Sequence, residues 1–390
     1  MDGFFNKSDI KDPTPRRTRL SGCASCKLNK RCSNPKEKPR GKGKKKILII
    51  DDIPGRTHRI LENTLEDLGL SQERDCWTVG SVTCRTPDGR TPTRQEIDGC
   101  RPNLNRALED LDPHVVISLG SSGVESFLGD RWTSGGISGV SRWRGWTIPD
   151  REHHVWFCPT YHPSFIDPRK RDDVASVIIR QDLERALSLI DTPVPVFKDE
   201  TDLVKVTTDP RKAEKYLLDL YEKKPTIAID YETTGLKPDE VGHRIVTVGI
   251  SEGSEHGVAF PLTERIVEPL RRVLGSPKIK MIAANMKFEQ RWSMKCLDVR
   301  PEGWVWDTVE AAHVLDNRRG KITGVKFQSF VQFGLLDYST DVEGFLKSGG
   351  KNGNAFNTID EAPMRDLLIY NALDALTEFR LARHQKGSMI

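Results

Sequence analysis

Long apolar runs are missing from this 390-residue sequence, of which 36% is hydrophobic. A transmembrane helix needs about 20 consecutive apolar residues, so no segment is expected to cross a bilayer. The first twenty residues, MDGFFNKSDIKDPTPRRTRL, also lack the apolar core of a signal peptide. We therefore expect a protein of the cytoplasm that has no membrane partner.

A large excess of either charge is missing as well. The sequence has 60 Lys and Arg against 56 Asp and Glu, a net charge of +4, so charge alone does not indicate a nucleic-acid partner. Its distribution is more informative, because residues 36–46, KEKPRGKGKKK, hold seven basic residues and one acid. This stretch is expected to be flexible and to be either a solvated linker or a strip that contacts phosphates.

Eight cysteines are present, and in the cytoplasm they indicate metal or cluster ligation rather than disulfides. Cys23 and Cys26 are separated by two residues, a spacing typical of zinc and iron–sulfur sites. Cys84 and Cys100, with fifteen residues between them, are a plausible second pair. The residues alone leave the choice between zinc and an iron–sulfur cluster open.

Short apolar strands alternate with amphipathic helices in the first half of the sequence. Such alternation predicts a mostly parallel sheet with helices on both faces, a three-layer α/β/α domain. Thr93 is placed to cap a helix that begins at Arg94. Strands are expected at residues 47–50, 115–119 and 155–158, and a strand with a turn at residues 77–83; further helices are expected at residues 58–70 and 174–190.

A change of composition separates two domains. Residues 191–200, DTPVPVFKDE, contain two prolines and no helical periodicity, so they are expected to be a linker. Residues 20–190 would form the first domain, behind an N-terminal tail of residues 1–19, and residues 201–390 the second. The second domain is also α/β, and an antiparallel meander of strands is expected in it.

Two acids follow a buried strand in the second domain. Asp230 and Glu232 come after a short apolar run, and the alternation of a strand puts their side chains on one face. Close carboxylates repel each other unless a cation lies between them. Tyr370 and Asp374 are four residues apart, so a helix presents both on one face. With Glu289, this set suits two Mg²⁺ or Mn²⁺ ions about 3.5–4 Å apart and a tyrosine that orients the attacking water.

The order DxE, NxxxFE, WDT and YxxxD across residues 200–388 closely resembles the DEDD-superfamily 3′–5′ exonucleases of the tyrosine subtype, and among them the proofreading domains of family A DNA polymerases. The resemblance implies a ribonuclease H-like fold and hydrolysis of a DNA strand from its 3′ end. Carried onto this sequence, it makes Asp230, Glu232 and Asp374 the metal ligands and Tyr370 the residue that orients the water. Glu289 would help to position the second ion or its waters.

Other residues near these motifs are candidates for contacts with DNA. Asn285 and Phe288 would support the site or meet the terminal nucleotides. Leu236 would wedge against the terminal base, or else be a buried leucine at a turn. Asp307 of the WDT motif is expected to be a helix N-terminal or core-polar residue and not a metal ligand.

The first domain carries a second resemblance. A CxxC pair, a strand followed by Pro-Gly, the loop CRTPDGRTPTRQEIDGC, VVISLG and PTYHPS occur in the order of the family 4 uracil-DNA glycosylases, over roughly residues 20–190. The resemblance implies a [4Fe–4S] cluster, with a zinc ion as the alternative. Its ligands would be Cys23, Cys26, Cys84 and Cys100, and Cys32, Cys76 and Cys158 would lie outside the set.

The catalytic elements of that family are less well matched. Residues 51–55, DDIPG, stand in place of GEAPG, so Asp52 replaces the glutamate, and Gly80 stands where an asparagine reads uracil. His162 of PTYHPS keeps the position that meets the flipped base, or it is a structural hydrogen-bonding histidine. We therefore expect weak glycosylase activity or none, and a cluster-stabilised domain that binds DNA or a partner.

Together the two resemblances predict a metal-dependent exonuclease for single-stranded 3′ ends behind a glycosylase-like domain, the order found at the front of certain bacteriophage family A polymerases. The sequence stops sixteen residues after Asp374, too few for a polymerase domain. The polymerase is thus expected on another chain or on a missing C-terminal part, and the location would be the cytoplasm of a bacterial host. The alternatives are a uracil-excising repair enzyme and a non-catalytic replisome assembly factor.

Overall fold

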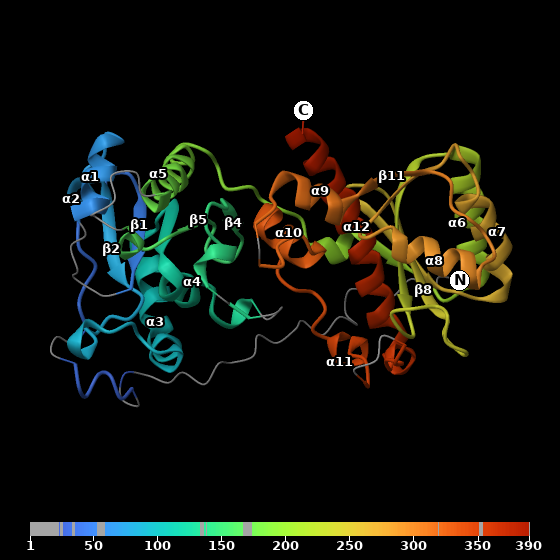
Figure 1. Cartoon of the computed structure of the whole chain (residues 1–390), viewed down its shortest axis with the longest axis horizontal. Coiled ribbons are helices and arrows are strands. Elements are labelled where there is room, and N and C mark those ends of the chain that lie inside the picture. The colour runs from blue at the N-terminus through green and yellow to red at the C-terminus, as the bar shows by residue number, and fades with distance from the viewer. Residues whose placement is uncertain are drawn as a thin grey trace. The chain divides into compact units, whose positions relative to one another are not determined.

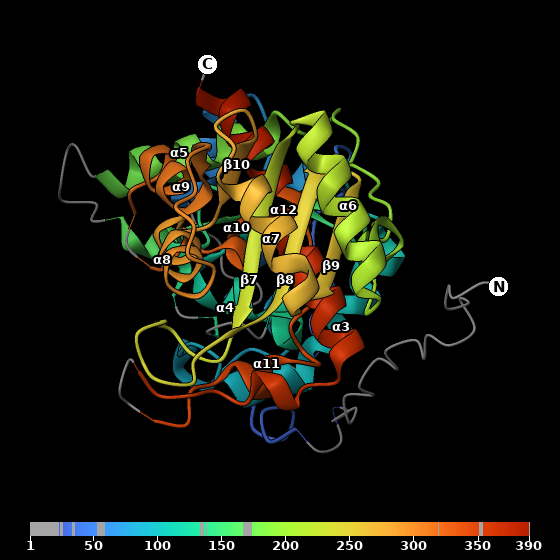
Figure 2. The ribbon, with the colours of Figure 1, turned by 90° about the vertical axis from the view of Figure 1, so that its right-hand side faces the viewer.

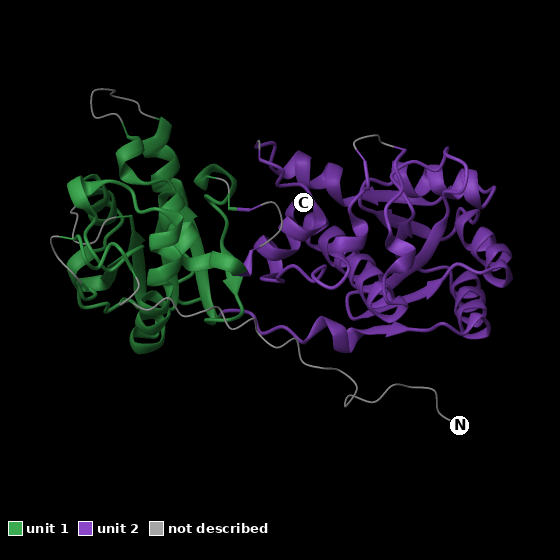
Figure 3. Ribbon diagram, turned by 90° about the horizontal axis from the view of Figure 1, so that it is seen from below, with its two compact units in different colours: residues 1–130, 137–193 green, residues 131–136, 194–390 purple. Residues whose placement is uncertain are grey.

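The structure is a computed structural model of the 390-residue chain, shown in Figure 1. It falls into two compact units, coloured in Figure 3: residues 1–130 with 137–193 (unit 1), and residues 131–136 with 194–390 (unit 2). None of the described helices is long and apolar enough to cross a membrane. The residues that the structure describes are 23, 26–32, 36–52, 59–132, 136–137, 139–166, 174–318, 320–350 and 354–389, so the expected tail and residues 53–55 of the DDIPG element lie outside them.

Unit 1 is built on a five-stranded sheet with the order β2 (Cys76–Gly80), β1 (Ile47–Asp51), β3 (Val115–Leu119), β5 (Val155–Thr160) and β4 (Ile148–Asp150). The first four strands run parallel to one another, and β4 is antiparallel to β5. All residues of β1, β3 and β5 are buried, as expected for strands that helices cover on both faces. The mostly parallel sheet is therefore confirmed, and the strand with a turn expected at residues 77–83 is a strand that ends at Gly80 and is followed by a bend.

Helices cover this sheet as the alternation predicts. The α-helices described in unit 1 are α1 (Arg59–Asp67), α2 (Gln72–Asp75), α3 (Arg94–Leu111), α4 (Gly120–Leu128) and α5 (Val174–Leu187). Thr93 caps α3, because its side chain accepts a hydrogen bond from Glu96 N while the Glu96 carboxylate accepts one from Thr93 N. α4 packs on β1, β3 and β5. The sequence did not predict α4, because its stretch GSSGVESFL is rich in glycine and serine.

The basic stretch of residues 36–46 is held by backbone hydrogen bonds. Arg40 N donates to Thr78 O at 3.0 Å, and Lys42 N donates to Glu73 O at 2.9 Å. Arg40 and Thr78 also form an antiparallel bridge beside β2. The expectation of a flexible strip is therefore wrong for this stretch, because its partners are distant in sequence and leave no local signal.

Unit 2 holds a six-stranded mixed sheet with the order β11 (Trp304–Asp307), β10 (Lys280–Ala283), β7 (Thr226–Thr233), β8 (Ile245–Gly253), β9 (His256–Pro261) and β6 (Val204–Val206). β7, β8 and β9 form the expected antiparallel meander. β10 runs parallel to β7, and β11 runs parallel to β10. This order and these directions make the ribonuclease H-like fold that the resemblance implied.

The helices of unit 2 lie on both faces of its sheet. Figure 2 shows α6 (Pro210–Lys223) and α7 (Glu264–Leu274) in front of β7, β8 and β9, with α12 (Met364–Met389) behind these strands. One large apolar core joins α6 and α7 to the sheet, and a smaller one joins Ala259 of β9 to Leu368 and Ala372 of α12. Further α-helices are α8 (Lys287–Cys296), α9 (Thr308–Leu315), α10 (Val325–Phe333) and α11 (Glu343–Leu346).

A glycine lets α12 approach β8 closely. Gly249 of β8 lies opposite Asp230 of β7 in the sheet register. A Cβ atom at Gly249 would lie 2.4 Å from the backbone oxygen of Asn371, far inside van der Waals contact. Glycine at this position therefore allows α12 to bring Asn371 and Asp374 up to β7.

Candidate functional site

The paired acids of β7 and an acid of α12 come together in unit 2. Asp230, Glu232 and Asp374 each offer a carboxylate oxygen, and these oxygens all lie within 4.8 Å of one another. Strand alternation puts Asp230 and Glu232 on one face, and α12 brings Asp374 to that face. At this spacing the three carboxylates can share one divalent ion.

Asn371 orients the first of these acids. Its Nδ2 donates a hydrogen bond to Asp230 Oδ2 at 2.6 Å, and its Oδ1 accepts one from Thr247 Oγ1 at 2.9 Å. The Asn371 side chain is completely buried, so water does not compete for these bonds. A single amide therefore ties α12 to β7 and β8 at Asp230.

Two tyrosines and a lysine surround Asp374. The Tyr338 hydroxyl donates a hydrogen bond to Asp374 Oδ1, and the Tyr338 ring centroid lies 5.9 Å from that of Tyr370. Lys326 Nζ lies 5.2 Å from the Tyr370 ring centroid and 3.7 Å from Asp337 Oδ1. Sequence reasoning found Tyr370 through the YxxxD motif but missed Tyr338 and Lys326, because neither belongs to a recognisable spacing.

Two further glutamates are buried beside these acids. Glu289 of α8 and Glu378 of α12 are each only 2% exposed. The Oε2 atom of each is enclosed and has no hydrogen-bond partner in the part of the chain that the structure describes. The sequence singled out Glu289 but missed Glu378, although Glu378 follows Asp374 by four residues and so lies one turn further along the same helix face.

Burial raises the pKa of all these carboxyl groups, and repulsion from neighbouring carboxylates adds to the rise. For Asp230, burial contributes most, and the negative charge of Asp374 adds to it. The pKa of Glu378 lies well above its usual range because of burial and because of the charges of Asp230, Glu289 and Asp374. The positive charge of Lys326 opposes the rise of the pKa at Asp374. Simultaneous ionisation of the whole set therefore calls for more positive charge, which divalent cations supply. The donor set thus fits metal ions.

Asp307 is a structural residue, as predicted. Its Oδ1 accepts hydrogen bonds from the backbone N atoms of Asn285, Val309 and Glu310 at 3.0, 3.0 and 3.2 Å, and its Oδ2 accepts one from Met286 N at 2.9 Å. It therefore caps α9 and also fixes the turn that leads into α8. Asn285 has a φ of 61°, a left-handed conformation that asparagine adopts more readily than most residues.

The two apolar candidates differ in burial. Phe288 packs on Trp292 at the edge of the unit 2 core, with 5.9 Å between their ring centroids. Leu236 is 66% exposed, so the alternative of a buried leucine at a turn is wrong. An exposed leucine four residues after Glu232 is available for contact with a ligand.

A small cavity in unit 1 is lined by all the cysteines that were expected to be ligands. Asn103 Nδ2 donates a hydrogen bond to Cys100 Sγ at 3.4 Å, and Thr83 N donates to the same sulfur at 3.1 Å. Burial raises the pKa of the Cys84 thiol to about 11, and a hydrogen bond with Cys32 adds to this rise. Cys32, expected outside the set, therefore lies beside it. The four cysteines of the cavity lining are Cys23, Cys26, Cys84 and Cys100.

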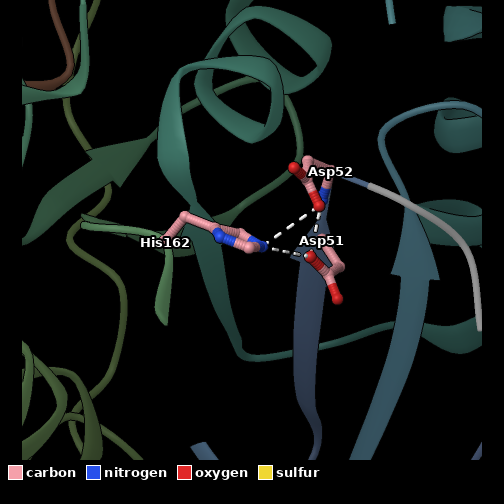
Figure 4. Close-up of side chains that lie close together, drawn as sticks. All are labelled: Asp51, Asp52 and His162. Atoms are coloured by element: carbon pink, nitrogen blue, oxygen red, sulfur yellow. Dashed lines mark hydrogen bonds and ion pairs between the residues drawn. The ribbon is translucent and has the colours of Figure 1, made fainter. Parts of the chain in front are cut away.

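His162 points its imidazole toward two aspartates at the carboxyl end of β1, as Figure 4 shows. Its Nε2 is 3.1 Å from both Asp51 Oδ1 and Asp52 Oδ1, and its Nδ1 is 2.7 Å from Ser164 Oγ. Burial alone would lower the pKa of His162, but the hydrogen bonds and charges of the two aspartates outweigh burial and raise the pKa to about 9. Asp52 and His162, both singled out from the sequence, thus lie together, with Asp51 as a third member that the sequence did not single out.

Two family profiles match the sequence. That of the DNA polymerase A 3′–5′ exonuclease domain matches residues 204–385, and that of the uracil DNA glycosylase superfamily matches residues 54–183. The exonuclease match lies within unit 2, and the glycosylase match lies within unit 1 except for residues 131–136. They follow one another in the order that the motifs predicted.

Individual relatives agree with these profiles. A DNA polymerase of Bacillus phage SP01 is 26% identical over 396 residues, which covers 90% of this chain but only 41% of the polymerase. The type-4 uracil-DNA glycosylase of Saccharolobus solfataricus is 31% identical over 161 residues, 36% of this chain and 71% of that enzyme. The structure of Escherichia coli RNase D covers 48% of this chain and 46% of its own, with 16% identity and a TM-score of 0.35, a likeness too weak to bear on function. The chain therefore belongs to the uracil-DNA glycosylase superfamily through unit 1 and joins it to a DNA polymerase A-type 3′–5′ exonuclease domain in unit 2.

Proposed function

We propose that unit 2 removes nucleotides from the 3′ ends of DNA with the help of two divalent ions, Mg²⁺ or Mn²⁺. The observation that carries the proposal is the convergence of Asp230, Glu232 and Asp374 oxygens within 4.8 Å of one another, in a domain that matches a 3′–5′ exonuclease profile. The enclosed Oε2 atoms of Glu289 and Glu378 support it, because an anionic oxygen buried without a donor is stabilised by a cation.

The ligands divide into two groups that share Asp230. One ion would be held by Asp230, Glu232 and Asp374, and the other by Asp230, Glu289 and Glu378. The second group is supported by the charge of Asp230, which after burial is the largest influence raising the pKa of both Glu289 and Glu378. When bound, such ions activate a water molecule and neutralise the charge that develops on the leaving 3′ oxygen.

The neighbouring side chains position the reacting groups. Tyr370, on the same helix face as Asp374, would orient the attacking water. Tyr338 holds Asp374 by its hydrogen bond, and Asn371 holds Asp230. Groups fixed in advance do not have to reorient during the reaction, and this lowers its barrier.

Substrate contacts would come from residues around the acids. Leu236 is exposed and apolar, so we assign it to the terminal base, and Asn285 and Phe288 would meet the terminal nucleotides. Lys326, whose positive charge lowers the pKa of Asp374, would contact a phosphate of the DNA. The preference for DNA and a proofreading role rest on the phage DNA polymerase relative, with the polymerase on another chain or on a further part of this protein.

For unit 1 we infer a scaffold that binds DNA or a protein partner and has little or no glycosylase activity. Gly80 offers no side chain to read uracil, and two aspartates engage His162. Excision of uracil is the second candidate function, favoured by the match to the glycosylase superfamily, and release of free uracil without added metal would demonstrate it. Hydrogen-bond donors beside the thiols support a [4Fe–4S] cluster, or a zinc ion, at Cys23, Cys26, Cys84 and Cys100.

The exonuclease is tested with a 5′-labelled single DNA strand and the full chain in Mg²⁺. We expect a ladder that shortens from the 3′ end and disappears both with EDTA and in Asp230→Ala. Asp219→Ala, which removes an exposed carboxylate of α6, is the matched control and should cut like the parent. Full-length DNA in Mg²⁺ and in Mn²⁺ would overturn the proposal and favour the non-catalytic replisome assembly factor.

A further inference from the structure

We propose that Asp51, Asp52 and His162 of unit 1 form a binding site for a divalent transition-metal ion, separate from the acids of unit 2. One ligand atom from each of the three residues lies within 4.8 Å of the others. Figure 4 shows the imidazole Nε2 pointing between the two carboxylates. The proposal goes beyond the exonuclease and does not depend on it.

The distances suit a small ion. His162 Nε2 is 3.1 Å from Asp51 Oδ1 and 3.1 Å from Asp52 Oδ1. Nitrogen and oxygen ligands about 2.0–2.2 Å from a tetrahedral ion lie about 3.3–3.6 Å from each other. An opening of a few tenths of an ångström would therefore admit the ion without rearrangement of the backbone.

The surroundings of the three side chains favour ligation. Ser164 Oγ lies 2.7 Å from His162 Nδ1, and Ser164 N donates a hydrogen bond to the same nitrogen at 3.1 Å, so Ser164 fixes the imidazole with Nε2 directed at the two carboxylates. The Oδ1 atom of Asp52 is fully enclosed and, beyond its ion-pair contact with His162, has no hydrogen-bond partner in the described parts of the chain. Asp51 is held by the backbone N of Asp52, which donates to Asp51 Oδ1 at 2.7 Å.

The place in the fold is one where α/β proteins bind ligands. Asp51 ends β1 and His162 follows β5 by two residues, so both lie at the carboxyl edge of the parallel strands. The Asp52 side chain is 17% exposed, which leaves a path to solvent. One imidazole and two carboxylates suit Zn²⁺, Mn²⁺ or Fe²⁺, and a fourth position would remain for water or another ligand.

The test uses Mn²⁺ and the full chain with Asp230→Asn and Asp374→Asn, which weaken the site in unit 2. Mn²⁺ is the probe because it favours oxygen and nitrogen over the thiolates of unit 1. Electron paramagnetic resonance follows the loss of the free Mn²⁺ signal, and electron spin-echo modulation detects a directly bound imidazole nitrogen. We expect one bound Mn²⁺ per chain with nitrogen coupling.

Variants within this background identify the ligands. Asp52→Asn should weaken Mn²⁺ binding on the order of tenfold or more, and His162→Gln should remove the nitrogen coupling. Asp112→Asn is the matched control, because Asp112 is an exposed acid of unit 1 paired with Lys46, and it should change neither. Thermal unfolding checks that each variant is folded. If His162→Gln does not fold, the result for Asp52→Asn alone decides the proposal. Bound Mn²⁺ without nitrogen coupling in the background protein, or affinity and coupling unchanged by Asp52→Asn, overturns the proposal.

Discussion

The hydroxyl of Tyr338 donates a hydrogen bond to the carboxylate of Asp374, across 36 residues of sequence. Asp374 is therefore held by a residue outside every motif that predicted the site. Tyr370 lies beside Tyr338, with 5.9 Å between the two ring centroids. In our proposal the two tyrosines have different roles: Tyr338 fixes the metal ligand Asp374, and Tyr370 orients the attacking water.

Tyr338→Phe should lower kcat on the order of tenfold. It removes a hydrogen bond to a charged group, worth about 1.5–3 kcal/mol, from a carboxylate that must keep its orientation. Steady-state kinetics on a 5′-labelled strand measure the effect, and Tyr221→Phe on α6 is the matched control. Since Tyr338 does not itself face the water in our proposal, Tyr370→Phe should cost more. Parental kcat in Tyr338→Phe would show that Asp374 is fixed without this bond.

Glu378→Gln should weaken the second metal site without unfolding the protein. The substitution keeps the shape of the side chain but removes one carboxylate, so the weaker of two Mn²⁺ affinities should fall on the order of tenfold. Calorimetric titration with Mn²⁺ measures it, with Glu289→Gln as the positive comparison and Glu222→Gln, an exposed acid of α6, as the control. If the weaker Mn²⁺ affinity fell in Glu289→Gln but not in Glu378→Gln, Glu378 would be a buried structural acid and not a metal ligand.

Without metal, the protein should become less stable as the pH rises. The pKa values of Glu232, Glu289 and Glu378 in the folded protein lie well above the ordinary value of 4.5, so the folded state holds more protons than the unfolded state above that pH. The stability that these three glutamates contribute is fully present when the pH is below their ordinary pKa. It is lost as the pH rises through their raised pKa values in the folded protein. Thermal unfolding in EDTA from about pH 5 to 8 should show a falling Tm.

Mg²⁺ should reverse that trend. The ion binds the ionised carboxylates and only the folded state assembles them, so its stabilisation grows with pH. The rise in Tm on adding Mg²⁺ should therefore be larger near pH 8 than near pH 5, and Asp230→Asn should reduce it. A Tm in EDTA that climbs with pH over this range would contradict the assignment of raised pKa values.

Gly249→Ala should damage the site from outside it. The new methyl group would meet the backbone of Asn371 and push α12 away from β8, at a cost of about 1–3 kcal/mol in stability. Separation of Asp374 from Asp230 should lower Mn²⁺ affinity and exonuclease activity together. Gly253→Ala is the control on the same strand, because a Cβ there meets nothing within 4 Å. Equal activity of the two variants would refute the close approach.

The parts of the site that could be predicted are those encoded by local periodicity. Asp230 and Glu232 follow from strand alternation, and Tyr370 and Asp374 from helical spacing, because each pair needs only one element to come together. Tyr338 reaches Asp374 from a separate segment, so no spacing announces it. Glu378 fits the same helical spacing as Asp374, but it belongs to none of the motifs that the resemblance rests on.

The fold divides in the same way. The buried strands and the Thr93 cap carry strong local signals, and the structure has them within a few residues of the expected bounds. α4 is held by packing on three strands and not by its own glycine- and serine-rich sequence, so it was missed. Residues 36–46 were misjudged for a related reason, since their backbone partners lie about one strand and one helix further along the chain.

Asp307 shows how structural acids can be told apart from candidate metal ligands where the sequence alone does not distinguish them. Its two oxygens accept hydrogen bonds from four backbone N–H groups, so its acceptor capacity is used within the chain. Glu289 and Glu378 are more deeply buried than Asp307, and each keeps an oxygen that no donor in the described part of the chain reaches. Counting the hydrogen-bond donors around each carboxylate, rather than the charges, thus separates structural carboxylates from those that remain available to a ligand. This count needs no bound ion.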